Sequence, residues 1–319
     1  MPSRSYALWL PNWRLETVRT NPAGKMSVSR GYSQPMVLPA MPQPRILMCP
    51  PDHYGIEYEI NPWMNRSLGA VRELAFRQWK NLRDALVSLG VQVETLTPQP
   101  GLPDLVFTAN AGLVFHSTFL SSRFRHEVRA RESPYFEAWF AEHGFTVEHL
   151  PENMYHEGAG DALFCGDTLF AGYRTRSDAT AHQWVGQQLG VRVLPLELVN
   201  PRFYHLDTCF CPLAAGEALF YPDAFDAYGQ RVVQTHVPKL IAVNEAEAFR
   251  FGCNAVVVGK TVVHNSRCPE MAASLAAAGY RSIEVELDEF LKAGGSAKCL
   301  TLRLDGEEAA GWKYTTAAA

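Results

Sequence analysis

Near its carboxyl-terminal end the sequence reads Gly294-Gly295-Ser296-Ala297-Lys298-Cys299-Leu300-Thr301-Leu302-Arg303-Leu304. A glycine pair allows a ligand to approach the backbone closely. Cysteine attacks as the thiolate, so a nucleophilic cysteine needs a pKa below its usual value of about 8.5 at neutral pH. We expect Lys298 and the amides of the glycine loop to lower that pKa. Taken alone, however, Cys299 fits a small buried core residue better than a nucleophile.

The arrangement at Cys299 recurs along the chain. A polar residue stands before a short apolar strand at five places, and the other four are Asn110, Asp161, Asp207 and Asn254. Repeated units of roughly 20–50 residues that cannot each bury their apolar face indicate modules that pack together. If five modules close into a ring, the five polar residues converge on its axis. Cysteine, histidine and carboxylates from distant parts of the chain then share one pocket.

The segments between these positions have the periodicity of strands and helices. Strand-like pieces follow a glycine ahead of four of the five positions, and residues 168–171 and 260–263 are expected to return the chain as hairpin partners. Apolar residues at helical spacing predict helices at 68–89, from 133 to the glycine at 144, near 179–189 and at 269–278. The first strand of the body is expected at 46–49.

Composition limits the class of protein. The chain has 319 residues, a formal net charge of −4 and 47% hydrophobic residues, which suits one large enzyme domain or two. The negative charge argues against a nucleic-acid partner, and no apolar run reaches the ~20 residues that span a bilayer. The 7 cysteines lack zinc-ligand spacing. We therefore expect a reduced, cytoplasmic protein without metal or cofactor, and leave a homo-oligomer open.

The two ends differ from the rest. Residues 1–44 are basic and rich in proline and serine, which is typical of a loose tail. A targeting peptide is the less favoured alternative. We expect a catalytic body at 45–307 and a short tail at 308–319.

A histidine and two carboxylates complete the candidate chemistry. In a strand, alternation would place His205 and Asp207 on one face, where a carboxylate orients the imidazole for acid–base catalysis. A structural His–Asp hydrogen bond is the alternative. Glu157 lies among glycines that expose the backbone beside it, although such turns also occur without function. Two carboxylates near a nucleophile suit a planar cation such as guanidinium.

The chain resembles the guanidino-group modifying enzymes, which comprise arginine deiminases, dimethylarginine dimethylaminohydrolases and amidinotransferases. It is most similar to bacterial arginine dihydrolases, including the amino-terminal domain of the type fused to ornithine cyclodeaminase. The similarity extends from about residue 45 to about 305. It is carried by residues 48–52, 61–64, 103–112, 203–212 and the cysteine loop.

The resemblance implies an α/β fold, the five-bladed α/β propeller called the pentein fold, with pseudo-fivefold ββαβ modules. It implies that Cys299 attacks the guanidinium carbon of L-arginine, that His205 protonates the departing ammonia and then activates water, and that Glu157 pairs with His205 or the substrate. It also implies a set of substrate-binding residues: Asp207 and Asp161, Asp104 and Asn61, and Arg176 for the substrate carboxylate, with Arg174 as its competitor.

Two departures from the family pattern affect the predicted reaction. Deiminases carry an aspartate where this chain has Asn110, and their Glu-Gly-Gly-Asp is one residue longer here, at 157–161. Ionised aspartate only accepts hydrogen bonds, whereas asparagine also donates them. We expect Asn110 to let the site retain a neutral ureido intermediate and hydrolyse it again, giving ornithine, carbon dioxide and a second ammonia.

Other activities remain open from the sequence. An arginine deiminase would stop at citrulline, a dimethylarginine dimethylaminohydrolase would take methylated arginine, and an amidinotransferase would use an amine acceptor in place of water. A non-catalytic ring-shaped binding protein of the same fold has no need of Cys299, His205, Glu157 and Asp207 together.

Overall fold

The computed structural model describes residues 17–20, 26–29 and 43–314. The chain forms two compact units, Met1–Pro42 and Gln43–Ala319. In the first unit, β1 (Thr17–Thr20) pairs antiparallel with β2 (Met26–Ser29). Most of the basic tail expected at 1–44 lies outside the described residues. The body begins with β3 (Arg45–Met48), which corresponds to the strand predicted at 46–49.

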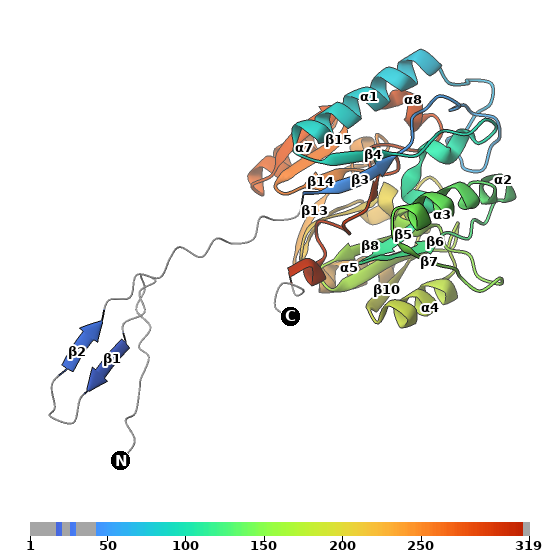
Figure 1. Ribbon diagram of the computed structural model, residues 1–319. Coiled ribbons are helices and arrows are strands. Elements are labelled where there is room, and N and C mark those ends of the chain that lie inside the picture. Colours follow the sequence, from blue (N-terminus) through green and yellow to red (C-terminus); the bar gives the residue numbers. More distant parts are fainter. Residues whose placement is uncertain (1–16, 21–25, 30–42, 315–319) are drawn as a thin grey trace. The chain divides into compact units, whose positions relative to one another are not determined.

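Within residues 43–314 the structure contains five three-stranded sheets, which form the blades of a propeller (Figure 1). Each blade has a first, a middle and a third strand. The first strands are β5 (Gly112–Phe115), β8 (Ala162–Cys165), β11 (Phe210–Ala214), β14 (Val256–Val258) and β17 (Leu302–Arg303). The middle strands are β6 (Thr118–Ser121), β9 (Thr168–Tyr173), β12 (Glu217–Phe220), β15 (Thr261–Asn265) and β3. The third strands are β7 (Thr146–Glu148), β10 (Arg192–Glu197), β13 (Lys239–Ala242), β16 (Arg281–Val285) and β4 (Gln92–Thr95).

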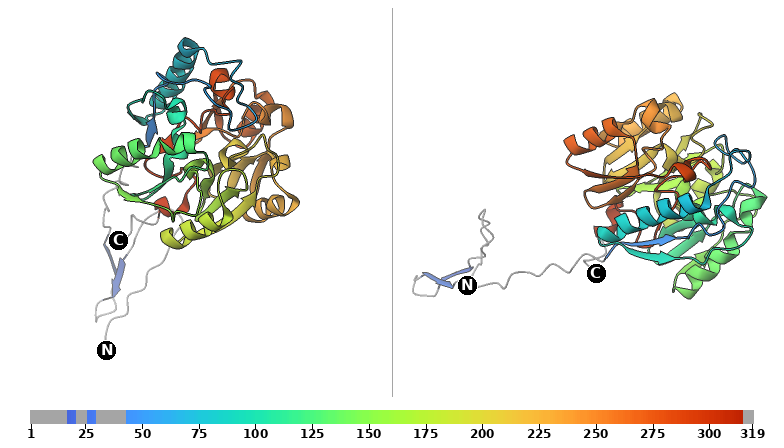
Figure 2. Two further views of the ribbon diagram at one scale, coloured as in Figure 1. Left: turned by 90° about the vertical axis from the view of Figure 1, so that its right-hand side faces the viewer. Right: turned by 90° about the horizontal axis from the view of Figure 1, so that it is seen from above.

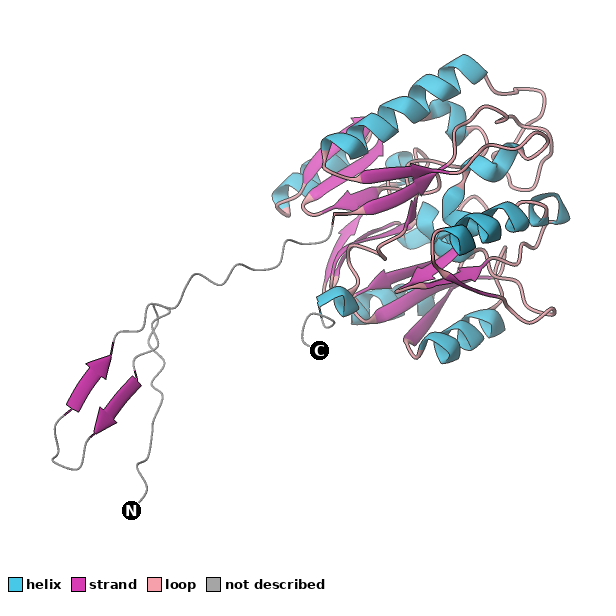
Figure 3. Ribbon diagram, viewed as in Figure 1, coloured by secondary structure: helices cyan, strands magenta, loops and turns pink. Residues whose placement is uncertain are grey.

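Pairing within a blade explains the helix in each module. The first strand is antiparallel to the middle strand, and in four blades a short hairpin joins the two, as between β8 and β9. The middle strand is parallel to the third strand, as between β9 and β10, and a parallel pair needs a crossover connection. The crossover helices are α1 (Arg72–Ser88), α3 (Ser133–Glu142), α4 (Ala179–Leu189), α5 (Ala227–His236) and α7 (Pro269–Ala277). They lie at the outside of the body, with strands toward its centre (Figures 2 and 3).

Four of these helices were predicted from the sequence, with α1 beginning at Arg72 and not at 68. The fifth, α5, was not predicted, because it buries only Gly229 and Val233 and so has few apolar residues at helical spacing. Its local signal is the N-cap, since the Asp226 side chain accepts a hydrogen bond from the Gly229 amide at 2.7 Å. Shorter helices are α2 (Glu127–Ala130), α6 (Glu245–Ala248) and α8 (Asp288–Leu291).

The ends of the body meet in one blade. Strand β17 pairs antiparallel with β3, with Leu302 opposite Leu47, so the last strand closes the ring against the first. The predicted five-bladed α/β propeller is thereby confirmed. In the left view of Figure 2 the colours of the body pass around it in sequence order.

The segment after the last blade packs on the body, although we expected a tail from 308. Ala309 and Ala310 are buried, and the Gly166 amide donates to the Ala309 carbonyl at 2.7 Å. These backbone hydrogen bonds hold the chain as far as Gly311, whose amide donates to the Gly166 carbonyl at 2.6 Å. Residues 315–319 lie outside the described part. Of the helices described, none is both long and apolar enough to cross a membrane.

Candidate active site

The polar residues that precede the five first strands converge, as the repeat predicted. All five are buried, with exposed fractions of 2% or less: Asn110, Asp161, Asp207, Asn254 and Cys299. Three of them lie in or next to short 3-10 turns. Asn110 is in η2 (Thr108–Ala111), Asp161 follows η3 (Gly158–Gly160), and Asp207 is in η4 (Leu206–Thr208). The sequence repeat therefore correctly predicted that these five residues, far apart in sequence, lie together.

Contacts between successive modules close the ring at this level. Asp161 Oδ1 accepts from the Leu206 amide at 3.1 Å, Asn254 Nδ2 donates to the Asp207 carbonyl at 3.0 Å, and Cys299 N donates to Asn254 Oδ1 at 3.1 Å. The Ala109 amide donates to the Cys299 carbonyl at 3.1 Å and connects the fifth module to the first. These short bonds determine the spacing of the site, because each module supports the next.

The Cys299 thiol lies between two polar side chains. Its Sγ donates to Asp207 Oδ2 at 3.2 Å, and Asn254 Nδ2 donates to Sγ at 3.1 Å. Burial raises the pKa of the thiol well above its ordinary value, and the Asp207 carboxylate raises it further. Our expectation of a lowered pKa is therefore wrong, because burial and Asp207 both favour the protonated thiol of Cys299. Burial also raises the pKa of Asp207, to about 7.

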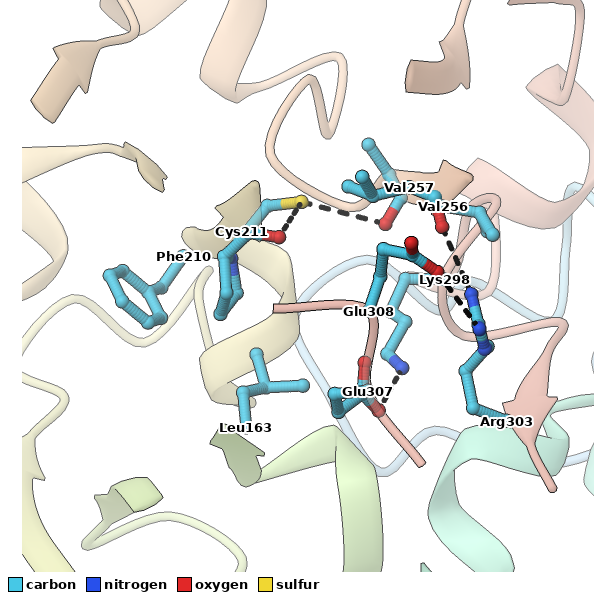
Figure 4. A pocket seen from close by; sticks show the side chains of 11 residues that line it. Leu163, Phe210, Cys211, Val256, Val257, Lys298, Arg303, Glu307 and Glu308 are labelled. Carbon is cyan, nitrogen blue, oxygen red and sulfur yellow. Dashed lines mark hydrogen bonds and ion pairs between the residues drawn. The ribbon is translucent and has the colours of Figure 1, made fainter. Parts of the chain in front are cut away.

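Lys298 does not face the thiol. Its Nζ forms an ion pair with Glu307 at 2.7 Å, and both side chains line a small cavity (Figure 4). The cavity is bounded by the first strands β8, β11 and β14 and by Arg303, and it holds about 20 Å³, room for about one water molecule. The side chains of Lys298 and Cys299 therefore point to different regions, and the Lys298 ammonium belongs to the charged residues around the cavity.

His205 pairs with Glu157. His205 Nε2 and Glu157 Oε2 are 2.8 Å apart, and the Glu157 carboxylate also accepts from Arg176 Nη1 at 2.9 Å. Burial disfavours ionisation of Glu157, but Arg176 and His205 outweigh it and hold the pKa of the carboxyl far below its usual range. Burial lowers the pKa of His205 to about 4, so its imidazole is neutral at neutral pH. Because Nε2 faces a carboxylate, it carries the hydrogen, and Nδ1 has the free lone pair.

The expected alternation of His205 and Asp207 on one strand face is wrong. Residues 206–208 form the turn η4 in place of a strand, because the chain must bend to enter β11. Asp207 is thereby directed to Cys299, and the carboxylate beside His205 comes from another module. Asp207 Oδ1 is buried without a hydrogen-bond partner among the described residues.

Asn110 lies beside His205, with its Nδ2 3.5 Å from His205 Nδ1. Its Oδ1 accepts a hydrogen bond from Arg129 Nη1 at 2.8 Å, and Arg129 is itself buried. Asp104 is close to the same guanidinium, at 3.9 Å from Arg129 Nε. Burial raises the pKa of Asp104, and its Oδ1 has no hydrogen-bond partner in the described part of the chain.

The two arginines proposed for the substrate carboxylate are clearly separated by the structure. Arg176 is buried at 1% exposure, lies 4.8 Å from the Tyr204 ring, and keeps Nε without a hydrogen-bond partner among described residues. Arg174 has a side chain that is 57% exposed and pairs with Glu197 at 2.8 Å. Arg174 is therefore outside the site.

Two further predicted residues lie around the centre of the site. Both carboxylate oxygens of Asp161 are occupied, by the Leu206 amide and by the Ser177 hydroxyl at 2.6 Å, so Asp161 supports η4 and does not face the substrate space. Asn61 donates from Nδ2 to the Ala293 carbonyl at 3.0 Å, which joins the segment before α1 to the cysteine loop.

The segment 50–71 covers the site. The Ile60 carbonyl accepts from Arg176 Nη2 at 3.0 Å, and the Tyr54 hydroxyl donates to the Glu289 carbonyl at 2.8 Å. Together with Asn61 these bonds tie the cover to groups from the other modules. Cys299 is 2% exposed and His205 is 1% exposed, so both side chains are shielded from solvent.

Sequence reasoning missed three residues of the constellation. Asn254 was recognised as a strand-entry residue but not as the partner of the thiol, although its position in the repeat was the available signal. Arg129 and Glu132 form a buried pair at 2.8 Å next to Asn110, and a buried Arg–Glu pair leaves no local sequence signal. No group of three or more His, Cys, Asp or Glu within the described residues is arranged to hold a metal ion.

Comparisons with known proteins agree with this geometry. A family model described as "N,N dimethylarginine dimethylhydrolase, eukaryotic" matches residues 56–305. The bifunctional arginine dihydrolase/ornithine cyclodeaminase ArgZ of Synechocystis sp. is 49% identical over 82% of this chain, which spans 37% of that protein. The N(G),N(G)-dimethylarginine dimethylaminohydrolase of Mycobacterium tuberculosis is 40% identical over 82% of this chain and 85% of its own length.

A solved structure is also similar. The amino-terminal domain of ArgZ bound to substrate, an arginine dihydrolase from the ornithine–ammonia cycle in cyanobacteria, matches with a TM-score of 0.80 and 48% identity, over 84% of this chain and 99% of that chain. The chain therefore belongs to the dimethylarginine dimethylaminohydrolase family, within the guanidino-group modifying enzymes of the pentein fold.

Proposed function

We propose that the protein is an arginine dihydrolase that converts L-arginine and two waters into ornithine, carbon dioxide and two ammonia. The observation that carries the proposal is the neutral Asn110 carboxamide beside His205, in a site that also brings together Cys299 and Asp207. The similarity of ArgZ, which is named an arginine dihydrolase, supports the same reaction. Because the chain matches 37% of ArgZ, the ornithine cyclodeaminase activity in that name is not proposed here.

Binding of substrate would activate the nucleophile. The Cys299 thiol donates to Asp207, and Asp207 Oδ1 is a buried acceptor without a hydrogen-bond partner among the described residues. A guanidinium cation against Asp207 neutralises the carboxylate and favours the thiolate, since a positive neighbour lowers a thiol pKa. The raised pKa of the Cys299 thiol is then no obstacle, because the substrate supplies the compensating charge.

The first hydrolysis proceeds by covalent catalysis. The Cys299 thiolate forms a bond to the guanidinium carbon, and the carbon–nitrogen π electrons move to nitrogen. His205 Nδ1 takes up the proton that the Cys299 thiol loses and delivers it to the terminal nitrogen, which leaves as ammonia and gives a thiouronium. His205 then takes a proton from water, which attacks the same carbon, and the thiolate departs from a ureido product. Glu157 stabilises each imidazolium and orients the ring.

The remaining proposed residues bind or position the substrate. Asp104 offers a buried carboxylate oxygen to guanidinium nitrogens. Arg176 braces Glu157 and is also the proposed ligand of the substrate carboxylate, for which its unpaired Nε is available. Asn61 holds the cover over the substrate, and Asp161 acts through η4.

The second hydrolysis distinguishes this activity from a deiminase. We attribute it to Asn110, because a neutral carboxamide is compatible with a neutral ureido group, whereas an ionised carboxylate favours a cation and repels a carbonyl oxygen. Asn110→Asp is expected to release citrulline and one ammonia per arginine consumed. If that variant still released ornithine and two ammonia, Asn110 would not have the assigned role.

The deciding experiment is to incubate the purified chain with L-arginine, without added cofactor, and to quantify ornithine, citrulline and ammonia together. Ornithine with about two ammonia per arginine is expected from the two-step mechanism. Cys299→Ala is the control and should form none of these products. Citrulline with one ammonia would make the protein a deiminase and overturn the proposal.

Hydrolysis of dimethylarginine is the second candidate, because the matching family model and the 40% identical mycobacterial relative are described by that activity. The same cysteine, histidine and glutamate would act on the methylated guanidinium, and dimethylamine would leave in place of ammonia. Comparing kcat/KM for L-arginine and for dimethylarginine separates the two. An amidinotransferase would instead form a new guanidino product when glycine is added.

We also propose that the enzyme works in the cytoplasm as a homo-oligomer and requires no cofactor. The 7 cysteines are all free and buried, which suits a reducing compartment. Light scattering of the purified chain tests the oligomer, and a single monomeric mass across the working concentration range would contradict it. Activity that survives dialysis against chelator supports the absence of a cofactor.

A further inference from the structure

Asn254, the strand-entry residue of the fourth module, holds the nucleophile at several atoms. The residue is 0% exposed. Its Nδ2 donates to the Asp207 carbonyl at 3.0 Å and to Cys299 Sγ at 3.1 Å, and its Oδ1 accepts from the Cys299 amide at 3.1 Å. Its backbone carbonyl accepts from the Lys298 amide at 3.3 Å. Asn254 therefore contacts both the backbone of the cysteine loop and the sulfur itself.

The chemistry of these partners fixes the orientation of the carboxamide. The Cys299 amide is a donor only, so the atom of the carboxamide that faces it is the oxygen. The Asp207 carbonyl is an acceptor only, so the NH₂ group faces it. One hydrogen of that group is taken by the carbonyl, and the other is directed at Cys299 Sγ. An ionised aspartate, the residue type at the strand entries of the second and third modules, would have no hydrogen to offer here.

Two kinds of neighbour act on the Cys299 sulfur in opposite directions. Burial raises the pKa of the thiol, and the Asp207 carboxylate raises it further, whereas hydrogen bonds from the Ser296 backbone and from Asn254 act to lower it. Of the described side chains that bond Sγ, Asp207 is an acceptor and Asn254 is a donor. Asn254 is therefore suited to support the sulfur once it carries a negative charge.

We propose that Asn254 is a catalytic residue, whose NH₂ group stabilises negative charge on Cys299 Sγ when the thiolate forms and again when it departs from the substrate carbon. The proposal rests on the proposed function, in which Cys299 is the nucleophile, and adds a group to its mechanism. A donor that is already in place stabilises a developing charge without reorganisation at the moment of reaction. Asn254 meets this condition, because its bonds to Asp207 and to the Cys299 amide already hold it.

The donor acts at both ends of the covalent cycle. His205 Nδ1 takes the proton of the thiol, and a full negative charge appears on Cys299 Sγ. As the sulfur–carbon bond forms, the electron pair moves into that bond and the hydrogen bond from Asn254 weakens. After water has attacked the same carbon, the sulfur–carbon bond breaks, the pair returns to Sγ, and the hydrogen bond strengthens again. A more acidic thiol attacks somewhat more weakly but leaves faster, so the donor assists the departure most.

The test replaces one nitrogen by oxygen in the full chain. Asn254→Asp keeps an oxygen for the Cys299 amide and removes the donor to Sγ, which separates support of the loop from support of the charge. We expect kcat for L-arginine to fall by about tenfold or more, as for the loss of a hydrogen bond to a charged group, with a smaller change in KM. Alkylation of Cys299 by iodoacetamide at pH 8, which needs no substrate, should also slow by about tenfold.

The matched control is Asn265→Asp, the same substitution at another buried asparagine of the fourth module. Asn265 is 0% exposed and is the last residue of β15. Its Nδ2 donates to the Arg250 carbonyl at 2.9 Å, and its Oδ1 accepts from the Ser266 amide at 3.0 Å. This variant should lose stability to a similar extent in a thermal melt, and should keep the alkylation rate of Cys299 and kcat per folded molecule.

The outcomes separate the proposal from the function on which it rests. Slower alkylation and a lower kcat in Asn254→Asp, with Asn265→Asp unchanged, support it. An alkylation rate near that of the wild type overturns it, as do equal losses in both variants. Should Asn254→Asp fail to fold, Asn254→Ala, which also lacks the donor, is judged in the same way. Wild-type enzyme that stops at citrulline overturns the dihydrolase function and leaves this proposal standing, because the first hydrolysis uses the same thiolate.

Discussion

The ring of strand-entry residues and the cavity behind it are both lined by buried charged groups, but they satisfy those groups differently. At the ring, Asp207 Oδ1, Asp104 Oδ1 and Arg176 Nε have no hydrogen-bond partner among the described residues. In the cavity of Figure 4, Lys298 pairs with Glu307 at 2.7 Å and Arg303 pairs with Glu308 at 3.1 Å. Cys299 and Lys298 are consecutive, yet one belongs to each region.

The difference separates a site prepared for a ligand from a structural cluster. A buried polar atom without a partner costs free energy, so native proteins keep few of them and usually for a reason. At the ring the unpaired atoms are acceptors and a donor of the kind that an arginine substrate would satisfy. In the cavity the ion pairs join the carboxyl-terminal segment to the last blade and satisfy one another.

The largest expected effect is at the ring. His205→Asn should lower kcat for L-arginine by about 10²–10⁴-fold, because general acid–base catalysis contributes that much. Thermal stability should also fall, because the buried Glu157 carboxylate loses the hydrogen bond from His205 Nε2. Steady-state ornithine formation and a thermal melt check both. A kcat within a few-fold of wild type would remove His205 from the mechanism.

Removing the Lys298–Glu307 ion pair at the cavity should lower the free energy of unfolding more than it changes kcat. Glu307→Gln leaves the Lys298 ammonium, 8% exposed, without its partner, and loss of one member of a buried pair costs about 3 kcal/mol. Urea denaturation measures the loss. The double variant Glu307→Gln with Lys298→Met should recover most of it. A large fall in kcat per folded molecule, with unchanged stability, would contradict the division between the two regions.

The reactivity of the nucleophile in the empty enzyme tests its pKa. After burial, Asp207 is the largest cause of the raised Cys299 pKa, so Asp207→Asn should lower that pKa and speed alkylation by iodoacetamide at pH 8. Each unit of lowering gives about tenfold more thiolate. Mass spectrometry of the cysteine peptides measures it, and Cys211, whose pKa burial raises to about 12, is the internal comparison. Slower alkylation of the variant would show that Asp207 promotes the thiolate.

The smallest effect is expected at the surface. Arg174→Ala removes an exposed ion pair with Glu197, worth about 0–1 kcal/mol, and should leave KM for L-arginine unchanged. Arg176→Ala is the contrasting variant and should raise KM, because the buried guanidinium lies in the site. Steady-state kinetics of the two variants side by side decides between them. A raised KM in Arg174→Ala would reverse the assignment.

Local sequence patterns predicted the modular architecture well. A polar residue before an apolar strand is visible within a few residues, so Asn110, Asp161, Asp207, Asn254 and Cys299 were all found. Helices that end at glycine were found for the same reason. The helix α5 was missed because it buries only Gly229 and Val233, and its N-cap is its main local signal.

Partner assignments within the site were harder. Glu157 and His205 are 48 residues apart in sequence, and their pairing depends on how two modules meet. The neighbour of His205 in sequence, Asp207, was the natural choice and turned out to bind the thiol. Lys298 was expected to assist Cys299 because it precedes it, but the turn before β17 directs its side chain to Glu307.

By itself, the sequence determined that five modules place five polar residues at strand entries, and it identified Cys299, His205, Glu157 and Asp207 as the residues that carry the chemistry. Only the tertiary structure decided which polar group pairs with which, and that burial and Asp207 raise the pKa of the Cys299 thiol. The physical reason is the distance along the chain over which each kind of interaction acts. Strand and turn preferences act over a few neighbouring residues, whereas hydrogen-bond partners and pKa values depend on burial and on charges that folding brings from distant modules.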